Sequence, residues 1–499
     1  MKRSLVLLAA TLPMLASTAV AQTPRGWEKV SGPPAGIPGI TDGILGDRQN
    51  SYAWAMDVLG DHLYVGTSRN VFGTMLTMGG FPVDWTKPGP IPLPTDMRGR
   101  IYRMDMKTGA WSLHYQPPAI PAPTPPVLGL DTGYRMMRTY RPRHGAPVLY
   151  AGSAGMSLCR LLAIRGAGDP VPIFQATKPG KIVSIRAITE HQGRLFWAAE
   201  DEWGPAIWHA ADPLGEFTKD PSAGFAKLTP PDDWFPPNGA EILDMISYEG
   251  WMYVFFLTYD TTDSGFWCGK FRQVGGKWQW RLVVGDETLG ARYAPGLGRP
   301  NNGGAVPILF HGQVYVGTLD GAAFRMMNAI FPPGGSMQNP VDMMGGAVGM
   351  QIYRFDRRDR WERVMPGASV TDPDEVEMQN GFRNPLNKYI WRFGILDGRL
   401  YAGTFDIGTG LSVLMPLMGP GPSFTAPTPL GFDLYFTYDG KHWVRSSRNG
   451  FDDPWNYGTR SFATDPKTGD LYMGTANPFY GCQIWRKKSI WSLWWDRHH

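Results

Sequence analysis

The sequence is poor in charged residues and in cysteine. Only 18% of the 499 residues are charged, and 48 Lys and Arg residues stand against 44 Asp and Glu residues, which gives a formal net charge of +4. A near-neutral chain without a block of like charges gives no support for nucleic-acid binding, so we expect no nucleic-acid partner. An even number of cysteines would indicate a disulfide framework in an exported chain. The three present fall in non-neighbouring units of the repeat described below, and we expect buried free thiols at Cys159, Cys268 and Cys482.

Long apolar runs are also missing. A membrane span needs about 20 apolar residues, and no segment of that length after the N-terminal region is free of charges and prolines. The short apolar run from Leu5 to about Leu15 follows Lys2 and Arg3 and precedes small residues that end at Ala21. This order is typical of a secretory signal peptide. We therefore expect residues 1–21 to be cleaved after Ala21 and the mature protein to be secreted or periplasmic. A retained N-terminal anchor is the alternative.

Glycine, proline and aromatic residues are abundant, with 62 Gly, 45 Pro, 20 Trp and 20 Tyr. This composition favours many short strands joined by many turns and disfavours long helices. A motif of a polar turn followed by a short strand recurs seven times, as DHLYVGTSRN, PVLYAGSAG, GRLFWAAED, GWMYVFFLT, GQVYVGTLD, GRLYAGTFD and GDLYMGTAN, which begin at 61, 147, 193, 250, 312, 398 and 469. Self-similarity at a spacing of tens of residues is the signature of a repeat architecture.

The segments around each motif copy indicate four strands per repeat. An apolar segment precedes each copy, a third strand such as QIYRFD follows, and a fourth often carries Trp, as in RWERVMP. The sequence therefore predicts an all-β fold, a seven-bladed β-propeller of four-stranded antiparallel blades spanning residues 22–486. The segment GWEKVSG resembles a fourth strand, so we expect an N-terminal outer strand to close the ring and residues 487–499 to form a Trp-rich tail. The alternative is that this tail is itself the fourth strand.

One segment carries a family resemblance. YDGKHW, from Tyr438 to Trp443, resembles the Asp-box of sialidase-like propellers, in which Asp and Gly form a tight turn and Trp packs beneath it. The chain resembles exported bacterial seven-bladed propellers of this broad group, most of them uncharacterised. The resemblance implies the fold but not the catalysis, because Asp-boxes are structural turns and no match to the sialidase nucleophile set is found.

Three loops between second and third strands are long and apolar, at about 70–97, 322–350 and 407–431. Met-rich surfaces adapt to varied apolar partners, and a large exposed apolar patch usually marks an interaction site. The alternative is that the loops pack on one another as a lid. The residues expected to contact a partner are Met75, Met78, Phe81, Trp85, Met326, Met327, Phe331, Met343, Met344, Leu414, Met415 and Met418.

Aligning the first strands on the repeated aromatic residue brings a charged residue to the same position in blades two, three, four, six and seven. Blades one and five carry Ala55 and Val306 at this position. We expect these residues to converge on the central channel and to bind a carboxylate, sulfate or phosphate, because an Arg fork matches such groups. The alternative is structural, with the arginines bonded to neighbouring blades and the aspartate paired with one of them. The five are Arg138, Arg186, Asp244, Arg392 and Arg460.

Other chemistry is weakly indicated. The sequence contains no HExxH, GxSxG or CxxCH, and its nine histidines are scattered, so we predict no metal site and no cofactor. Acidic residues directly after the second strands have the ligand type for a cation, but we favour solvated loop carboxylates for them. They are Glu200, Asp201, Asp320 and Asp406.

These observations favour an exported binding module over an enzyme, because no catalytic set is complete. We expect the apolar loops to contact an envelope protein, a hydrophobic ligand or, peripherally, a membrane surface. The alternative is a sialidase-like or lyase-type enzyme that grips an anionic substrate with the central arginines.

Overall fold

The computed structural model describes the chain in segments, and its secondary structure is mostly β. The expected signal peptide, residues 1–21, lies outside the described residues. These are 26–32, 47–73, 91, 95–120, 127–142, 145–201, 204–213, 226–228, 230–231, 240–258, 265–299, 302–321, 349–365, 379–417 and 424–498.

Consecutive antiparallel strands form separate groups along the chain. The first group is β2 (Asn50–Leu59), β3 (His62–Arg69), β4 (Ile101–Asp105) and β5 (Trp111–Tyr115). The second is β8 (Gly133–Tyr140), β9 (Val148–Ile164) and β10 (Val171–Ser184), and the short pair β6 (Ala119–Ile120) and β7 (Leu128–Gly129) precedes it. The third is β11 (Ala187–His191), β12 (Arg194–Asp201), β13 (Gly204–Ala210) and β14 (Ala226–Leu228).

The later groups repeat the same order. The fourth is β15 (Ala240–Tyr248), β16 (Trp251–Thr258), β17 (Trp267–Val274) and β18 (Lys277–Val284). The fifth is β19 (Asn302–Phe310), β20 (Gln313–Asp320), β21 (Ile352–Phe355) and β22 (Trp361–Met365), and the sixth is β23 (Asn387–Leu396), β24 (Arg399–Asp406), β25 (Asp433–Thr437) and β26 (Val444–Arg448). The last is β27 (Gly458–Thr464), β28 (Leu471–Ala476) and β29 (Ile484–Lys487), with β1 (Glu28–Lys29) as its outer strand.

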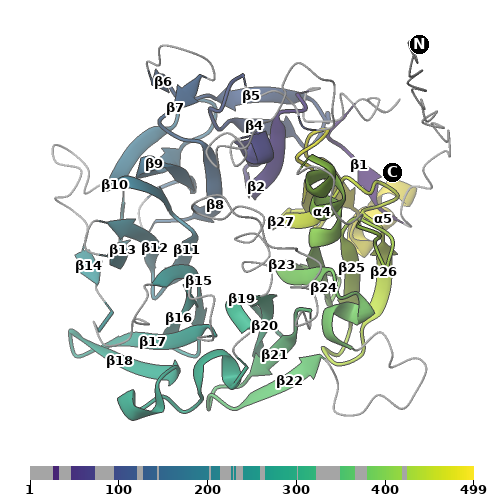
Figure 1. The fold of residues 1–499 in the computed structure, drawn as a ribbon. Helices are drawn as coiled ribbons and strands as arrows, with labels where there is room; N and C mark the ends of the chain where they lie inside the picture. The colour runs from purple at the N-terminus through teal and green to yellow at the C-terminus, as the bar shows by residue number, and fades with distance from the viewer. Residues whose placement is uncertain are drawn as a thin grey trace, which may run out of the picture.

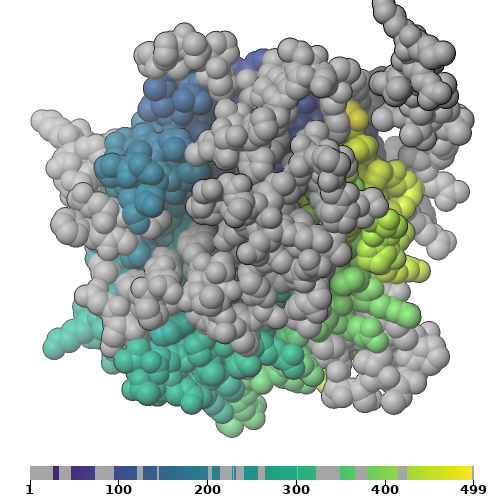
Figure 2. Space-filling model, in the orientation of Figure 1, coloured from purple at the N-terminus to yellow at the C-terminus, as the bar shows by residue number. Residues whose placement is uncertain are grey.

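The groups stand around a common centre in the arrangement of a β-propeller (Figure 1). The first strand of each group contacts the first strand of the next, in the order β2, β8, β11, β15, β19, β23 and β27, and β27 contacts β2. Figure 2 shows the same side as a space-filling view, with residues from the middle of the chain, coloured teal to green, along its lower edge. Short 3-10 helices lie at Glu287–Leu289, Pro295–Leu297 and Asn380–Arg383.

Each copy of the repeated motif lies on the second strand of its group, and close packing explains the glycine of the motif. A Cβ atom at Gly66 would lie 2.6 Å from the Cβ of Tyr134 on the next group. At Gly474 it would lie 2.6 Å from the Cβ of Ala53, which belongs to β2 at the other end of the chain. Glycine is therefore required at Gly66 and Gly474, whereas Ala198 and Phe255 occupy the same position in the third and fourth groups.

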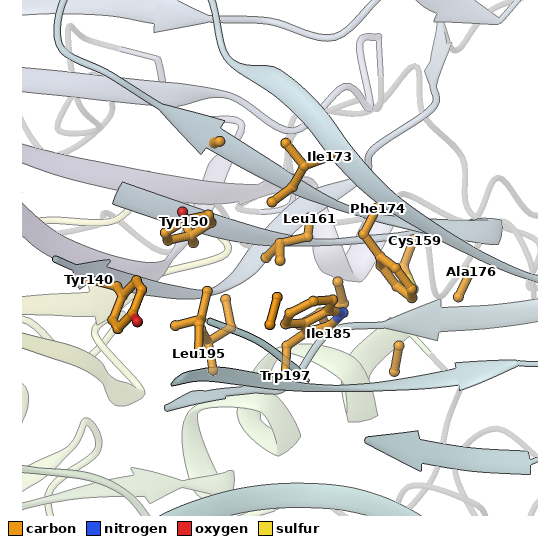
Figure 3. Packing of buried hydrophobic residues seen from close by; sticks show 14 of the residues in the cluster. Tyr140, Tyr150, Cys159, Leu161, Ile173, Phe174, Ala176, Ile185, Leu195 and Trp197 are labelled. Carbon is orange, nitrogen blue, oxygen red and sulfur yellow. The ribbon is translucent and has the colours of Figure 1, made fainter. Parts of the chain in front are cut away.

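The hydrophobic core consists of layers between neighbouring groups. Figure 3 shows one of them, where Leu161 and Phe174 of the second group meet Trp197 of the third. The rings of Phe174 and Trp197 lie 5.4 Å apart in an edge-to-face arrangement. Cys159 lies in the same layer, and all three cysteines are buried and form no disulfide, as the sequence predicted.

The two ends of the described chain meet at the last group. Glu28 pairs with Arg486 and Lys29 with Trp485, and the buried Trp27 packs on Tyr401 and Phe451. The alternative that the tail forms the outer strand is wrong for its described part, because Ile490–His498 form helix α5. The backbone N–H of Ile490 donates to the Asp397 carboxylate, which satisfies a free amide at the start of this helix. In the part of the chain that the structure describes, no helix has the length and apolarity needed to cross a membrane.

The segment that resembles an Asp-box forms a tight turn. The Asp439 carboxylate accepts hydrogen bonds from the backbone N–H groups of Lys441 and His442, at 2.8 and 2.9 Å. These bonds hold the pKa of Asp439 well below its usual range against the opposing effect of burial. Trp443 is buried beside Phe382, with ring centroids 5.6 Å apart. The turn therefore connects β25 to β26 and anchors the pair to the core.

The long apolar loops are described only in part. Ten of the twelve residues expected to contact a partner lie outside the described residues, and of Leu414 and Met415 only the backbone is described, as part of helix α4 (Ile407–Leu417). The described pieces pack inward. Leu411 of α4 joins a cluster with Leu243 and Val306 of the inner strands, and Val413 shares another with Phe72 of the first loop. This is the packing expected of a lid.

Candidate functional site

Bulges in the inner strands change the alignment of the predicted arginine cluster. A β-bulge inserts one extra residue, so that two residues of the bulged strand oppose one on its partner. The residues opposite the motif glycine, or its counterpart, are Ala55, Met136, Ala187, Asp244, Val306, Arg392 and Ser461. The predicted equivalence is therefore correct for Asp244 and Arg392, wrong by one residue for Arg186 and Arg460, and wrong by two for Arg138.

Two of the predicted arginines form ion pairs with carboxylates of β15. The Arg392 guanidinium donates to Asp244 at 2.9 Å, so Asp244 pairs with one arginine as the structural alternative expected. Burial raises the pKa of Asp244, and the charges of Arg392 and Arg138 oppose that rise. Arg186 pairs in the same way with Glu241, which the sequence analysis did not single out.

Arg460 differs from the other arginines because it is buried without a carboxylate partner among the described residues. Its residue exposure is 5%, and its buried Nε finds no hydrogen-bond partner there. Its guanidinium carbon instead lies 5.1 Å from the ring of Trp391 and 5.9 Å from that of Trp54. Burial, together with the charges of Arg392 and Arg135, holds the pKa of Arg460 well below its ordinary value.

Arg135 completes this cluster, and the sequence analysis missed it. It lies in the bulge of β8 between Tyr134 and Met136, and its guanidinium carbon is 5.0 Å from the ring of Trp54. Its Nη1 donates to Ser184 at 3.3 Å. Arg138 is exposed and affects Asp244 only through its charge. A sequence signal for Arg135 does exist, because it stands one residue before the residue that lies opposite the motif glycine. The residues at this same place in other groups are Trp54, Arg186, Leu243, Trp391 and Arg460.

Tyrosines surround the arginines on the same strands. Tyr389 is 8% exposed, and burial raises its pKa, while the charges of Arg392, Arg460 and Arg186 oppose that rise. The hydroxyl groups of Tyr52 and Tyr457 are hydrogen-bonded to each other beside Trp391. The described part of the cluster therefore combines more cations than carboxylates with aromatic faces and tyrosine hydroxyl groups.

The acidic residues at the ends of the second strands are not solvated where their side chains are described. Asp320 is 1% exposed and pairs with Lys388, and Asp406 is fully buried and accepts a hydrogen bond from Gly408 N at the start of α4. The expectation of loop carboxylates in water is therefore wrong for both, because Asp320 lies against Lys388 of β23 and Asp406 lies at the start of α4. The described side chains contain no group of three or more His, Cys, Asp or Glu placed to hold a metal ion.

Comparisons with known proteins assign the chain to no family. Neither a family pattern nor a curated protein matches it. Solved structures that resemble it include a GH74 xyloglucanase from Xanthomonas campestris, with 13% identity, 92% of this chain and 53% of that chain covered, and a TM-score of 0.43. The β-propeller domain of the Trilobed protease from Pyrococcus furiosus shares 9% identity over 87% of this chain and 94% of that chain, with a TM-score of 0.39. An α-L-arabinanase from Penicillium chrysogenum shares 11% identity over 88% of this chain and 93% of that chain, with a TM-score of 0.37.

Proposed function

We propose that the chain is a seven-bladed β-propeller closed by β1 and that it binds an anionic group at its inner arginine–tryptophan cluster. The cluster is defined as Arg135, Arg392, Arg460, Trp54 and Trp391. The strand groups, the contacts between successive first strands and the pairing of β1 with β29 support the propeller architecture. We propose a binding module and not an enzyme, because the cluster offers positive charge for an anion but no complete set of catalytic residues.

The observation that carries the binding proposal is the buried guanidinium of Arg460. Taking a charge out of water costs several kcal/mol, whereas contact with an aromatic face returns about 0.5 to 2 kcal/mol per ring. Trp391 and Trp54 therefore offset only part of the cost, and Arg392 and Arg135 add repulsion. An anion that presents two neighbouring oxygen atoms, such as a carboxylate or a sulfate, accepts hydrogen bonds from both arms of a guanidinium and supplies the missing negative charge.

The test is thermal unfolding of the full chain in sodium sulfate, sodium phosphate and sodium acetate, each compared with sodium chloride at equal ionic strength. A bound anion stabilises the folded state by about 2.7 kcal/mol at 100 times its Kd, so Tm rises with anion concentration. We expect Arg460→Met to abolish this rise and to be at least as stable as the parent chain without anion, because Met removes a buried charge that has no carboxylate partner among the described residues.

The control is Arg357→Met, which changes an exposed arginine far from the cluster in sequence and should keep the full anion response. A Tm that rises equally in Arg460→Met would show that the anion binds elsewhere. A parent chain that responds to no anion beyond chloride would also contradict the proposal. The contact of apolar loops with a partner stays a separate prediction, since the residues expected to make it lie outside the described side chains.

A further inference from the structure

Helix α5 turns its apolar side chains away from the protein. Ile490, Trp491 and Leu493 are 60%, 76% and 44% exposed, and Trp494 and Trp495 are 50% and 58% exposed. In Figure 1 the helix lies beside β1 at the outer edge of the ring. Five large apolar residues within six positions are far more than the single exposed hydrophobic residues that are normal on a protein surface.

Polar contacts hold the start of this helix to the body. Ser489 is buried, donates through its hydroxyl to Thr468 O at 2.5 Å and receives a hydrogen bond from Ser492 N at 3.0 Å. Asp496, one turn beyond Ser492, forms an ion pair with Lys488 at 2.7 Å. Residues three and four apart share one face of a helix, so the polar face carries Ser492 and Asp496 and the apolar face points outward.

A groove next to α5 adds positive charge to this surface. Its volume is about 380 Å³, and Trp27, Ile490 and Leu493 supply its apolar lining. Four cationic and two anionic side chains also line it, and Asp496, which pairs with Lys488, adds one negative charge beside it, which leaves a net charge of +1. The charged residues are Arg399, Arg486, Lys487 and Lys488 against Glu28 and Asp397.

We infer that α5 and this groove form a membrane-binding surface that prefers anionic lipids. Tryptophan favours the boundary between headgroups and acyl chains, where its apolar ring and its N–H are both satisfied. A nine-residue helix is about 14 Å long and lies in this boundary without crossing a bilayer core of about 30 Å. The adjacent cations match phosphate headgroups, and this combination of an aromatic face with flanking Lys and Arg is typical of interfacial helices.

Vesicle flotation of the full chain tests this inference, with phosphatidylcholine vesicles compared with vesicles that also contain phosphatidylglycerol. We expect flotation with the anionic vesicles and a loss of at least about tenfold in bound protein for the triple variant Trp491→Ala, Trp494→Ala and Trp495→Ala. Lys487→Gln with Lys488→Gln should weaken binding to anionic vesicles by about fivefold for each charge and leave binding to neutral vesicles unchanged.

The control is Val171→Ala with Ile182→Ala, which removes apolar side chains that are 51% and 57% exposed elsewhere and should float like the parent chain. The unfolding midpoint of the triple Trp variant should agree with that of the parent chain, because every changed Trp side chain is largely exposed. Flotation of the triple variant at the parent level would overturn the inference. So would a parent chain that ignores both vesicle types but forms a dimer by light scattering that the triple variant loses, since α5 would then bind a second copy.

Discussion

A buried ion pair between the fifth and sixth strand groups provides a sharp test of the packing described above. Lys388 of β23 and Asp320 of β20 are both fully buried in their side chains, and Nζ lies 3.1 Å from Oδ2. Asp320 also accepts a hydrogen bond from Gly349 N at 2.9 Å. Lys388→Met removes the cation but keeps most of the volume, which leaves the Asp320 carboxylate in the core without its counter-charge.

Lys388→Met should lower the unfolding free energy by about 3 to 5 kcal/mol, because removing one partner of a buried ion pair leaves the charge of the other partner buried and uncompensated. The double variant Lys388→Met with Asp320→Leu should recover most of this loss, because hydrophobic residues of similar volume replace a buried pair at little cost. Urea denaturation of the parent chain, the two single variants and the double variant gives the coupling energy directly.

A surface pair serves as the control. Arg360 lies closer to its partner, with 2.5 Å between Nη2 and Asp356 Oδ2, but its side chain is 62% exposed. Because water and salt screen such a pair, Arg360→Ala should leave the denaturation midpoint almost unchanged. The reasoning is refuted if Lys388→Met is no more destabilising than Arg360→Ala, or if the two changes at Lys388 and Asp320 are simply additive.

Three further predictions concern the chain ends, the lid and the turn of the sixth group. Trp27→Ala should lower the unfolding free energy by about 3 to 5 kcal/mol in urea denaturation, because it empties a buried site beside β1; a near-neutral effect would argue against a structural role for the N-terminal strand. Burial and the charge of Asp433 raise the pKa of Asp406 well above its ordinary value, so its contribution to stability is present at acid pH and is lost as pH rises through the folded-state pKa. Asp406→Asn should therefore flatten the fall in unfolding free energy from acid to neutral pH, and an unchanged pH profile would contradict this assignment. Asp439→Ala should cost about 1 kcal/mol by thermal unfolding, since it removes two backbone hydrogen bonds at a half-exposed turn, and Asp439→Asn should recover part of that loss.

The repeated motif shows what a local pattern predicts well. A polar turn, alternating apolar residues and a recurrent Tyr identify each second strand, because turn chemistry and burial on the two faces of a strand act over a few residues. Gly403 and its counterparts belong to this pattern, but the pattern does not say why a glycine stands there. The reason for the glycine became visible only in space, where a Cβ atom at Gly403 would collide with Thr459 of the next group.

The candidate site was predicted only in part, for a physical reason. Counting from the aromatic residue located Asp244 and Arg392, which the structure pairs directly. It could not place Arg135, because each bulge adds a residue whose position depends on the pairing of the whole strand. The partners Glu241 and Trp391 come from other groups of strands, and no pattern within one repeat specifies which neighbour a side chain will meet.

The sequence by itself determined the strand-rich architecture, the positions of the second strands and the burial of the cysteines, because composition, turn residues and alternation act locally. The tertiary structure decided which charges are neutralised and which are not. Asp320 and Asp406 look like solvated loop residues in the sequence but are buried, while the Trp-rich tail, for which a fourth strand was the alternative, forms an outward-facing helix. Burial, pairing and the free energy of a charge depend on residues far away in the chain, and these meet only when the strand groups pack against one another.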